Sequence, residues 1–410
     1  MQDIIIYNAN VVTPDRVIPQ GAVVLRDHMI EEVTDSRQVE DRYPHAQRVD
    51  AAGDYLLPGF IDIHSDNIET VIQPRPQSMI DFELAMREQE KQLVCQGITT
   101  MYHSLTIMDT HFGGERVAQK QQLRSPENLT KLIGLIRNFH EGDHLIRHRF
   151  HCRYDITNVQ CYPLLLEFIR QEKMQLLSFM DHTPGQGQYR DLEFFKNQVM
   201  GGSESDEEKD RILKQRMERA KVTEEQLKQA ADLAWEKGIP IASHDDDSVE
   251  KLDYVTGQLH AGICEFPVEL SVAQEARKRG MQVVVGATNV LMGRSHSGNL
   301  SALEAIRGGC ADILVSDYFP PAILHAVFRL VEQGLLTLPQ AAAMASRNPA
   351  KAVGIDSWVG SIEPGKCGDL LIVTRKNNIP VVRQTYINGE PVAAVQYRND
   401  FVGKDGTRYD

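Results

Sequence analysis

The sequence of 410 residues predicts an α/β protein whose centre is a (β/α)8 TIM barrel and whose two ends together form a small β-sandwich domain. Two observations predict the barrel: strand-like apolar runs alternate with helical patterns through the centre of the chain, and eight such runs can be counted. The sandwich is predicted because both ends are rich in short strands that would otherwise keep unpaired edges. We expect the sandwich in residues 1–57 and 363–410, and the barrel in 58–362.

The terminal strands are recognised as β-branched and apolar runs that lie between turn residues. They cover residues 4–7, 22–25, 29–33, 369–373 and 381–387. The last run leads directly into Asn388-Gly389, which is a strong signal for a hairpin turn.

The eight barrel strands are short apolar runs that are typical of buried parallel strands. They cover residues 59–64, 98–103, 149–155, 175–182, 239–244, 262–266, 281–286 and 313–317. Between the fourth and the fifth lies a segment, 201–237, whose charged run 203–211 predicts a helical insertion with a solvated face. A lid over the active site is the alternative interpretation of this segment.

Composition is that of an ordinary globular enzyme, with 42% hydrophobic residues and 44 Lys and Arg against 57 Asp and Glu. The net charge of −13 argues against nonspecific binding to nucleic acid or membranes. The chain has no long apolar run and no basic, apolar start, so we expect a cytoplasmic protein. Six cysteines without CxxC spacing predict reduced thiols. As a separate expectation, we predict that the protein is a homo-oligomer.

Several predicted barrel strands end in residues that can bind a metal ion, and barrel active sites lie at this end of the strands. The candidate metal ligands are His64, Asp66, His182, His244, Glu265 and Asp317. Gathering carboxylates and imidazoles in one small volume is costly without a cation. We therefore expect one or two divalent ions, with Zn2+ favoured by the nitrogen ligands and Mn2+ or Fe2+ as alternatives.

The third strand carries a further polar face, because His151, Arg153 and Asp155 alternate along it. This face contributes either to the site or to a buried structural network.

A loop after the seventh strand, residues 293–299, predicts a site for an anionic substrate. Small residues let the backbone approach an anion, and an arginine can bind phosphate oxygens through two N–H groups. The candidate substrate-binding residues are Arg294, His296, Ser297 and Asn299 in this loop, and Arg75 between two prolines after the first strand. A plain helix-capping turn is the alternative for the loop.

The segment from Pro58 to His64 resembles the start of the barrel in the amidohydrolase superfamily, whose members carry a β-sandwich made from both termini. Further stretches resemble, in order and spacing, the phosphonate-metabolism branch of that superfamily. These stretches start at His64, Gly97, Met180, Ala242, Glu265, Ser295 and Ser316, and the likeness runs from about residue 53 to residue 349.

The chain departs from the general superfamily pattern at its expected ligands. Most members have a His-x-His pair on strand one, a lysine on strand four, and histidines on strands five and six. Here His64 and Asp66 stand on strand one, while His182 and Glu265 stand on strands four and six. The phosphonate-metabolism branch resembles this chain in those same departures.

The resemblance implies a cytoplasmic, metal-dependent hydrolase of phosphonate catabolism with a small anionic substrate, a ribose triphosphate that carries a phosphonate group. The products would be the 5-phosphate and pyrophosphate, with Asp317 and His244 as catalytic residues. Two alternatives are an amidohydrolase or deaminase that acts on a C–N bond, and an inactive scaffold subunit.

Overall fold

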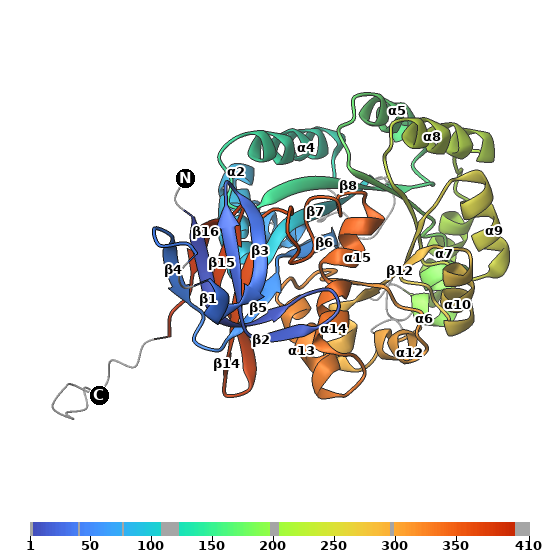
Figure 1. The fold of residues 1–410 in the computed structure, drawn as a ribbon. Helices are drawn as coiled ribbons and strands as arrows, with labels where there is room; N and C mark the ends of the chain where they lie inside the picture. Colours follow the sequence, from blue (N-terminus) through green and yellow to red (C-terminus); the bar gives the residue numbers. More distant parts are fainter. Residues whose placement is uncertain are drawn as a thin grey trace, which may run out of the picture.

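The protein consists of a barrel surrounded by helices and a separate β-sheet packed against one side of it (Figure 1). A computed structural model describes residues 3–39, 42–75, 78–107, 123–196, 205–295 and 299–397. The expected fold class is confirmed by this arrangement, since the sheet of the barrel is parallel and the second sheet is built from both ends of the chain.

Eight parallel strands form the barrel in sequence order, each beside the next. They are β6 (Phe60–Ser65), β7 (Ile98–Ile107), β8 (Arg147–Asp155), β9 (Leu176–Met180), β10 (Ile241–His244), β11 (Ile263–Glu265), β12 (Gln282–Gly286) and β13 (Ile313–Val315). The last strand returns to the first, because Ser65 pairs with Asp317 in a parallel bridge and the N–H of Asp317 donates to the carbonyl of His64 at 3.0 Å. Apolar side chains such as Tyr102, Leu176 and Val284 fill the interior.

Helices connect and follow the barrel strands, and several of them cover the outer face of the barrel. They are α1 (Asn67–Ile72), α2 (Phe82–Cys95), α4 (Pro126–Glu141), α5 (Tyr162–Arg170), α6 (Leu192–Phe194), α7 (Asp206–Met217), α8 (Glu224–Glu236), α9 (Val249–Gln258), α10 (Leu270–Lys278), α11 (Ala287–Met292), α12 (Ala302–Arg307), α13 (Ala322–Glu332), α14 (Leu338–Met344) and α15 (Arg347–Ala352). The sequence explains α4 directly: Ser125 accepts from the N–H of Asn128, Pro126 starts the first turn, and a buried apolar stripe follows. None of the helices in the described ranges is long and apolar enough to span a bilayer.

The segment between β9 and β10 is helical where it is described. In α7 only Leu213 is buried, as expected of a helix with a solvated face, whereas α8 packs on α5. Residues 197–204 lie outside the described residues.

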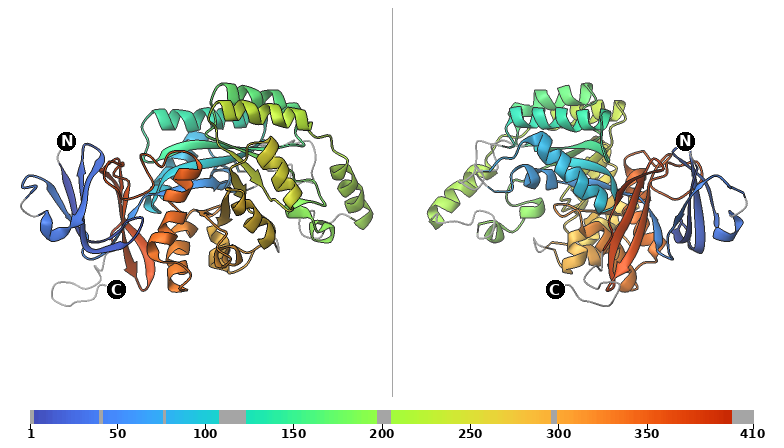
Figure 2. Two further views of the ribbon diagram at one scale, coloured as in Figure 1. Left: turned by 45° about the vertical axis from the view of Figure 1, so that its right-hand side comes forward. Right: turned by 90° about the vertical axis from the view of Figure 1, so that its left-hand side faces the viewer.

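The second sheet joins strands from the two ends of the chain. Its strands are β1 (Ile4–Val12), β2 (Val17–Arg26), β3 (Met29–Asp35), β4 (Gln47–Asp50), β5 (Tyr55–Pro58), β14 (Leu370–Lys376), β15 (Ile379–Ile387) and β16 (Glu390–Ala394). It folds over so that the N-terminal strands, in blue, and the C-terminal strands, in red, face each other in two layers (Figure 2). Ile6, Val23 and Leu25 pack there with Leu370 and Ile372.

The expected hairpin at Asn388-Gly389 joins β15 to β16, with φ of 50° and 73° at these two residues. Positive φ at both central positions is what the tight hairpin turn needs, and Asn and Gly adopt it at low cost. The division of the chain at residues 57/58 and 362/363 stays a prediction.

A buried ion pair fastens the terminal sheet to the barrel. Arg147, at the start of β8, pairs with Asp369, and both side chains are buried. The same guanidinium donates to the side chain of Asn388 and lies 5.1 Å from the ring centre of Trp358. The contact therefore joins the first residue of a barrel strand to the residue directly before β14 and to the β15–β16 turn.

We expect Asp369→Ala to lower the free energy of unfolding by about 3 to 5 kcal/mol, because it leaves the Arg147 charge buried and unpaired. Denaturant unfolding followed by circular dichroism measures this. Glu141→Ala, which breaks the exposed pair with Arg137, is the control and should change stability by less than about 1 kcal/mol. Equal effects of the two changes would contradict the structural role of Arg147–Asp369.

Candidate active site

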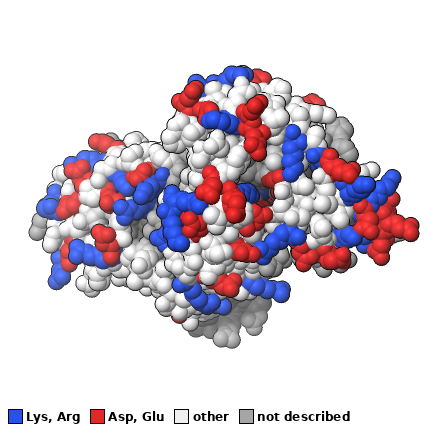
Figure 3. All heavy atoms as spheres, turned by 90° about the vertical axis from the view of Figure 1, so that its right-hand side faces the viewer, with Lys and Arg blue, Asp and Glu red and all other residues white. Residues whose placement is uncertain are grey.

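A cavity of about 390 Å³ lies at the carboxyl ends of the barrel strands. This volume is within the usual range for small-molecule sites. Its lining includes Asp66, Arg153, Gln188, His244, Asp245, Phe266, Asn289, Ser295, Asn299, Asp317 and Tyr318. On the side of the molecule that carries α9 and α10, a recess is bordered by side chains of both charges (Figure 3).

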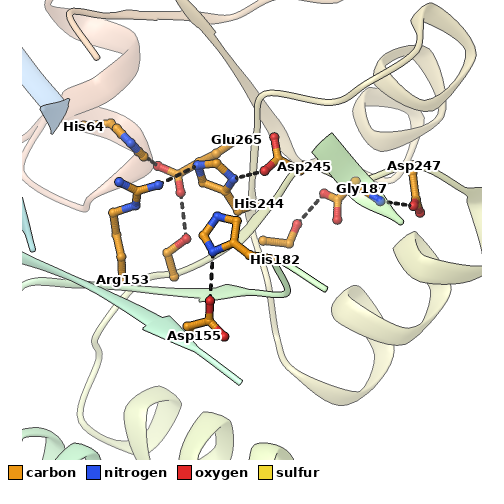
Figure 4. Close-up of polar contacts among 12 residues, drawn as sticks. His64, Arg153, Asp155, His182, Gly187, His244, Asp245, Asp247 and Glu265 are labelled. Carbon is orange, nitrogen blue, oxygen red and sulfur yellow. Dashed lines mark hydrogen bonds and ion pairs between the residues drawn. The ribbon is translucent and has the colours of Figure 1, made fainter. Parts of the chain in front are cut away.

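Three of the expected metal ligands meet at this end of the barrel. His64 from β6, His244 from β10 and Glu265 from β11 place one ligand atom each within 4.8 Å of one another (Figure 4). His64 Nδ1 lies 2.7 Å from Glu265 Oε1, with 1% and 0% of the two side chains exposed. Burial, with Arg153 and His244 nearby, holds the pKa of His64 well below its usual value, so the ring is neutral and has a lone pair for a metal.

Glu265 is held by residues from several strands. Ser178 of β9 donates to its Oε2 at 2.7 Å, and His151 Nε2 of β8 lies 3.9 Å from the same oxygen. The Nδ1 of His151 lies 3.0 Å from the carbonyl of Ile63, which can only accept, so Nδ1 carries the proton. Its buried Nε2 has no hydrogen-bond partner in the described part of the chain. A nitrogen lone pair that faces a carboxylate is unfavourable unless a cation or a proton lies near both.

The orientation of His244 is fixed by its neighbour. Its Nδ1 lies 2.7 Å from Asp245 Oδ2 and donates to this carboxylate, which leaves Nε2 unprotonated, with a lone pair that can bind a metal ion or accept a hydrogen bond. Nε2 lies 3.4 Å from Nη2 of Arg153.

These residues fit a divalent metal ion. The cluster offers two imidazoles and a carboxylate, which are ordinary zinc ligands, and the unpartnered Nε2 of His151 next to Glu265 is the kind of buried atom that a cation would satisfy. That His64, His244 and Glu265 bind a metal stays a prediction.

Two further expected ligands, Asp66 and Asp317, line the same cavity but lie outside the three-residue cluster. The N–H of Asp66 donates to the carbonyl of Asp317 at 2.8 Å, across the junction of β6 and β13. Burial, together with the Asp66 carboxylate, raises the pKa of Asp317 to about 7. Asp317 is therefore a carboxylate that takes up a proton readily.

His182, the remaining expected ligand, is positioned by a residue of the third strand. Its Nδ1 lies 2.8 Å from Asp155 Oδ2, and its ring centre is 6.4 Å from that of His244. Asp155 is fixed in turn by the N–H and the hydroxyl of Thr157. The polar face of β8 thus contributes to the site.

Three consecutive aspartates after β10 have three different environments. Asp245 lines the cavity, whereas buried Asp246 accepts from Ser243 and from Cys264. Asp247 accepts from the N–H of Gly187 at 2.6 Å, which ties the β9–α6 connection to this loop.

Three residues at strand ends have positive φ although they are not glycine: Asp245 at 52°, Phe266 at 54° and Asp317 at 62°. Each donates its N–H to a carbonyl of the adjacent strand, at 2.9, 3.1 and 3.0 Å. All three line the cavity. This backbone conformation costs on the order of 1 to 3 kcal/mol per residue, and it persists because the barrel ladder fixes it.

The expected anion loop is only partly at the cavity. Ser295 and Asn299 line it, but Arg294 is exposed and does not, and His296 and Ser297 lie outside the described residues. Helix α11 separates this loop from β12, and α12 begins with a capping box in which Ser301 and Glu304 bond each other's backbone. This capping box lies just after the loop, and the anion site in residues 293–299 stays a prediction.

Arg75 is exposed in the loop after α1, where its carbonyl accepts from the N–H of Ser78. It is absent from the cavity lining in the part of the chain that the structure describes. The substrate-binding roles of Arg75 and Arg294 stay predictions.

The chain is similar in sequence to known proteins. Residues 204–392 match the amidohydrolase family. The chain is 33% identical over 379 residues to the α-D-ribose 1-methylphosphonate 5-triphosphate diphosphatase of Escherichia coli (strain K12), covering 91% of this chain and 96% of that one. It is 25% identical over 182 residues to a dihydroorotase of Geobacter metallireducens, covering 34% of this chain and 42% of that one.

Solved structures of other proteins share the fold. The N-acetylglucosamine-6-phosphate deacetylase of Pasteurella multocida has a TM-score of 0.64 at 13% identity, over 96% of this chain and all (100%) of that one. An A. niger ochratoxinase has a TM-score of 0.64 at 12% identity, over 96% of both chains. At this identity the likeness concerns the fold alone.

We expect His64→Ala and His244→Ala each to weaken metal binding by more than about 100-fold, because changes to residues behind metal ligands already cost about 10- to 100-fold. Elemental analysis after dialysis against a metal buffer measures this. His144→Ala, which removes an exposed histidine, should keep the full metal content. Retention of metal by both site variants would contradict the assignment.

Proposed function

The chain belongs to the amidohydrolase family, with its phosphonate-metabolism members, and from this membership we propose that it hydrolyses α-D-ribose 1-methylphosphonate 5-triphosphate to the 5-phosphate and pyrophosphate. One observation carries the proposal: the similarity to the E. coli diphosphatase extends over nearly the full length of both chains. It therefore includes every strand end that lines the cavity.

The metal ligands that we propose are His64, His244 and Glu265, completed by Asp66, His182 and Asp317. When bound, a divalent ion, Zn2+ by our proposal, supplies an activated water and polarises a phosphoryl oxygen. Asp245 and Asp155 orient the imidazoles of His244 and His182 from behind, which supports a ligand role for both rings.

Asp317 accepts the proton of the attacking water in this proposal. The water oxygen forms a bond to the α phosphorus, the bond from that phosphorus to the bridging oxygen breaks, and its electron pair leaves on pyrophosphate. The side chain of Asp317 lines the cavity at the junction of β6 and β13, next to Asp66, which supports a role as the general base. His244, which lines the same cavity, is the second catalytic residue of this proposal.

A second candidate function is hydrolysis of a C–N bond. The partial similarity to a dihydroorotase supports it, and the same histidine and carboxylate cluster could direct water at a carbonyl carbon.

We also propose that the protein acts in the cytoplasm on a small anionic substrate. All six cysteines are free thiols, which supports a reducing compartment. The homo-oligomer stays a prediction.

NMR of the products tests the function: phosphorus NMR follows the two triphosphates, and proton NMR follows the amide, which contains no phosphorus. The metal-loaded enzyme is incubated with the ribose triphosphate, a nucleoside triphosphate and a dihydropyrimidine amide. Pyrophosphate and the ribose 5-phosphate are the expected products, and 18O from labelled water should appear on the 5-phosphate. Turnover of the amide alone would replace the proposal by its alternative.

We expect Asp317→Asn to lower kcat by about 10² to 10⁴, the usual contribution of a positioned acid or base, with a smaller change in metal content. The amide keeps the shape of the side chain but cannot take the proton. Steady-state kinetics measures the effect, and Asp253→Asn, at an exposed carboxylate on α9, should leave kcat unchanged. Near-normal kcat in Asp317→Asn would exclude Asp317 as the base and leave Asp245 and Glu265 as candidates.

A further inference from the structure

The charge of the cavity does not by itself suit a polyphosphate. Its lining contains three carboxylates, of Asp66, Asp245 and Asp317. Within the described ranges, the one Lys or Arg among the lining residues is Arg153 of β8. A triphosphate brings several negative charges, so the position of this cation is critical.

Other cations near the cavity are already engaged by the protein itself. Arg124 bonds Glu69 through two nitrogens, at 3.0 and 2.7 Å, and Lys221 pairs with Asp181 at 2.7 Å. Lys251 donates to the carbonyl of His244 at 2.8 Å. These contacts stabilise the loops around the site, and none of the three side chains lines the cavity.

Arg153 differs from them in its contacts. Its Nη2 makes one long hydrogen bond, 3.4 Å to His244 Nε2, and its buried Nε has no hydrogen-bond partner among the described residues. No carboxylate in the described part of the chain forms an ion pair with it. Its guanidinium lies beside His64, Glu265 and His244 (Figure 4). Next to the proposed reacting centre, the guanidinium of Arg153 therefore has N–H groups without an acceptor in the described ranges.

We propose that Arg153 binds the phosphoanhydride of the substrate and donates hydrogen bonds to the oxygens of the departing pyrophosphate. The proposal rests on the proposed function. A guanidinium can contact two phosphate oxygens at once, and it offsets charge that grows on the leaving oxygen as the bond from the α phosphorus breaks. The proton of the attacking water still goes to Asp317, and Arg153 keeps its own.

A purely structural role is the competing explanation, in which Arg153 only holds His244 in place. The two roles differ in what they change. Loss of a positioning contact to His244 would alter metal binding, whereas loss of a phosphate contact would alter the kinetics and the affinity for pyrophosphate while the metal content stays full.

The test uses the full-length, metal-loaded enzyme with Arg153→Met and Arg153→Lys. Methionine keeps the approximate length of the side chain but removes its charge. Lysine keeps the charge but lacks the planar guanidinium with its several N–H donors. We expect Arg153→Met to lower kcat/KM for the ribose triphosphate by about 10² to 10³, the usual cost of removing one donor to transition-state charge. Arg153→Lys should recover at least about tenfold of that loss, because the charge remains. Arg190→Met, which removes a cation two residues after cavity-lining Gln188, is the matched control and should stay near wild type.

Product inhibition separates this proposal from the proposed function. Inhibition by pyrophosphate, measured in excess Mg2+, should weaken at least about tenfold in Arg153→Met, with metal content and the visible spectrum of the Co2+ enzyme unchanged. A loss of metal that matches the loss of activity, or kcat/KM within about threefold of wild type, would overturn the role of Arg153. If wild-type enzyme releases no pyrophosphate, the proposed function fails, and the role of Arg153 in the reaction fails with it. If wild type releases it and Arg153→Met is normal, only the role of Arg153 fails.

Discussion

The site depends on one buried carboxylate, that of Glu265. Removing a charge from water is costly, and this side chain, with 0% exposed, is compensated by hydrogen bonds from two other barrel strands, β6 and β9. His64 contacts one oxygen from β6, while Ser178 of β9 and His151 of β8 approach the other. Because the strands converge on this carboxylate, its charge sets the arrangement of the imidazoles around it. A cation at the same point would offset that charge, and it would also satisfy the unpartnered Nε2 of His151.

The fold could be predicted from sequence in most of its parts, and the reasons are physical. Buried parallel strands are continuous apolar runs, so all eight barrel strands were identifiable, and the Asn388-Gly389 turn requires a backbone that few other residue pairs adopt. Helix α11 was not anticipated. Its six residues follow β12 without a turn residue between them, so the segment could not be distinguished from the loop that follows.

The site was less predictable, because side-chain direction at strand ends depends on single backbone angles. The three aspartates 245–247 look alike in sequence, yet only Asp245, with φ of 52°, lines the cavity. Likewise, the alternation along β8 predicts that Arg153 and Asp155 lie on the same face of the strand. It does not predict that this face reaches the cavity at the carboxyl ends of the strands. Arg294 stood out because it lies among small residues, and it is exposed. The strand-end angles depend on hydrogen bonds to neighbouring strands, which the local sequence does not contain.

The shared terminal sheet has a consequence for the order in which the chain can fold. Strand β5 is bordered by β1 on one side and by β14 on the other, with Leu56 opposite Ile372. When a ribosome has made the N-terminal strands, β14 does not yet exist, and almost the whole barrel must be synthesised first. During that interval the free edge of β5 and the apolar residues that face β14 remain exposed, which is the condition under which nascent chains associate wrongly. The buried Arg147–Asp369 pair also forms only at this last step, so closure of the terminal sheet completes the molecule rather than starting it.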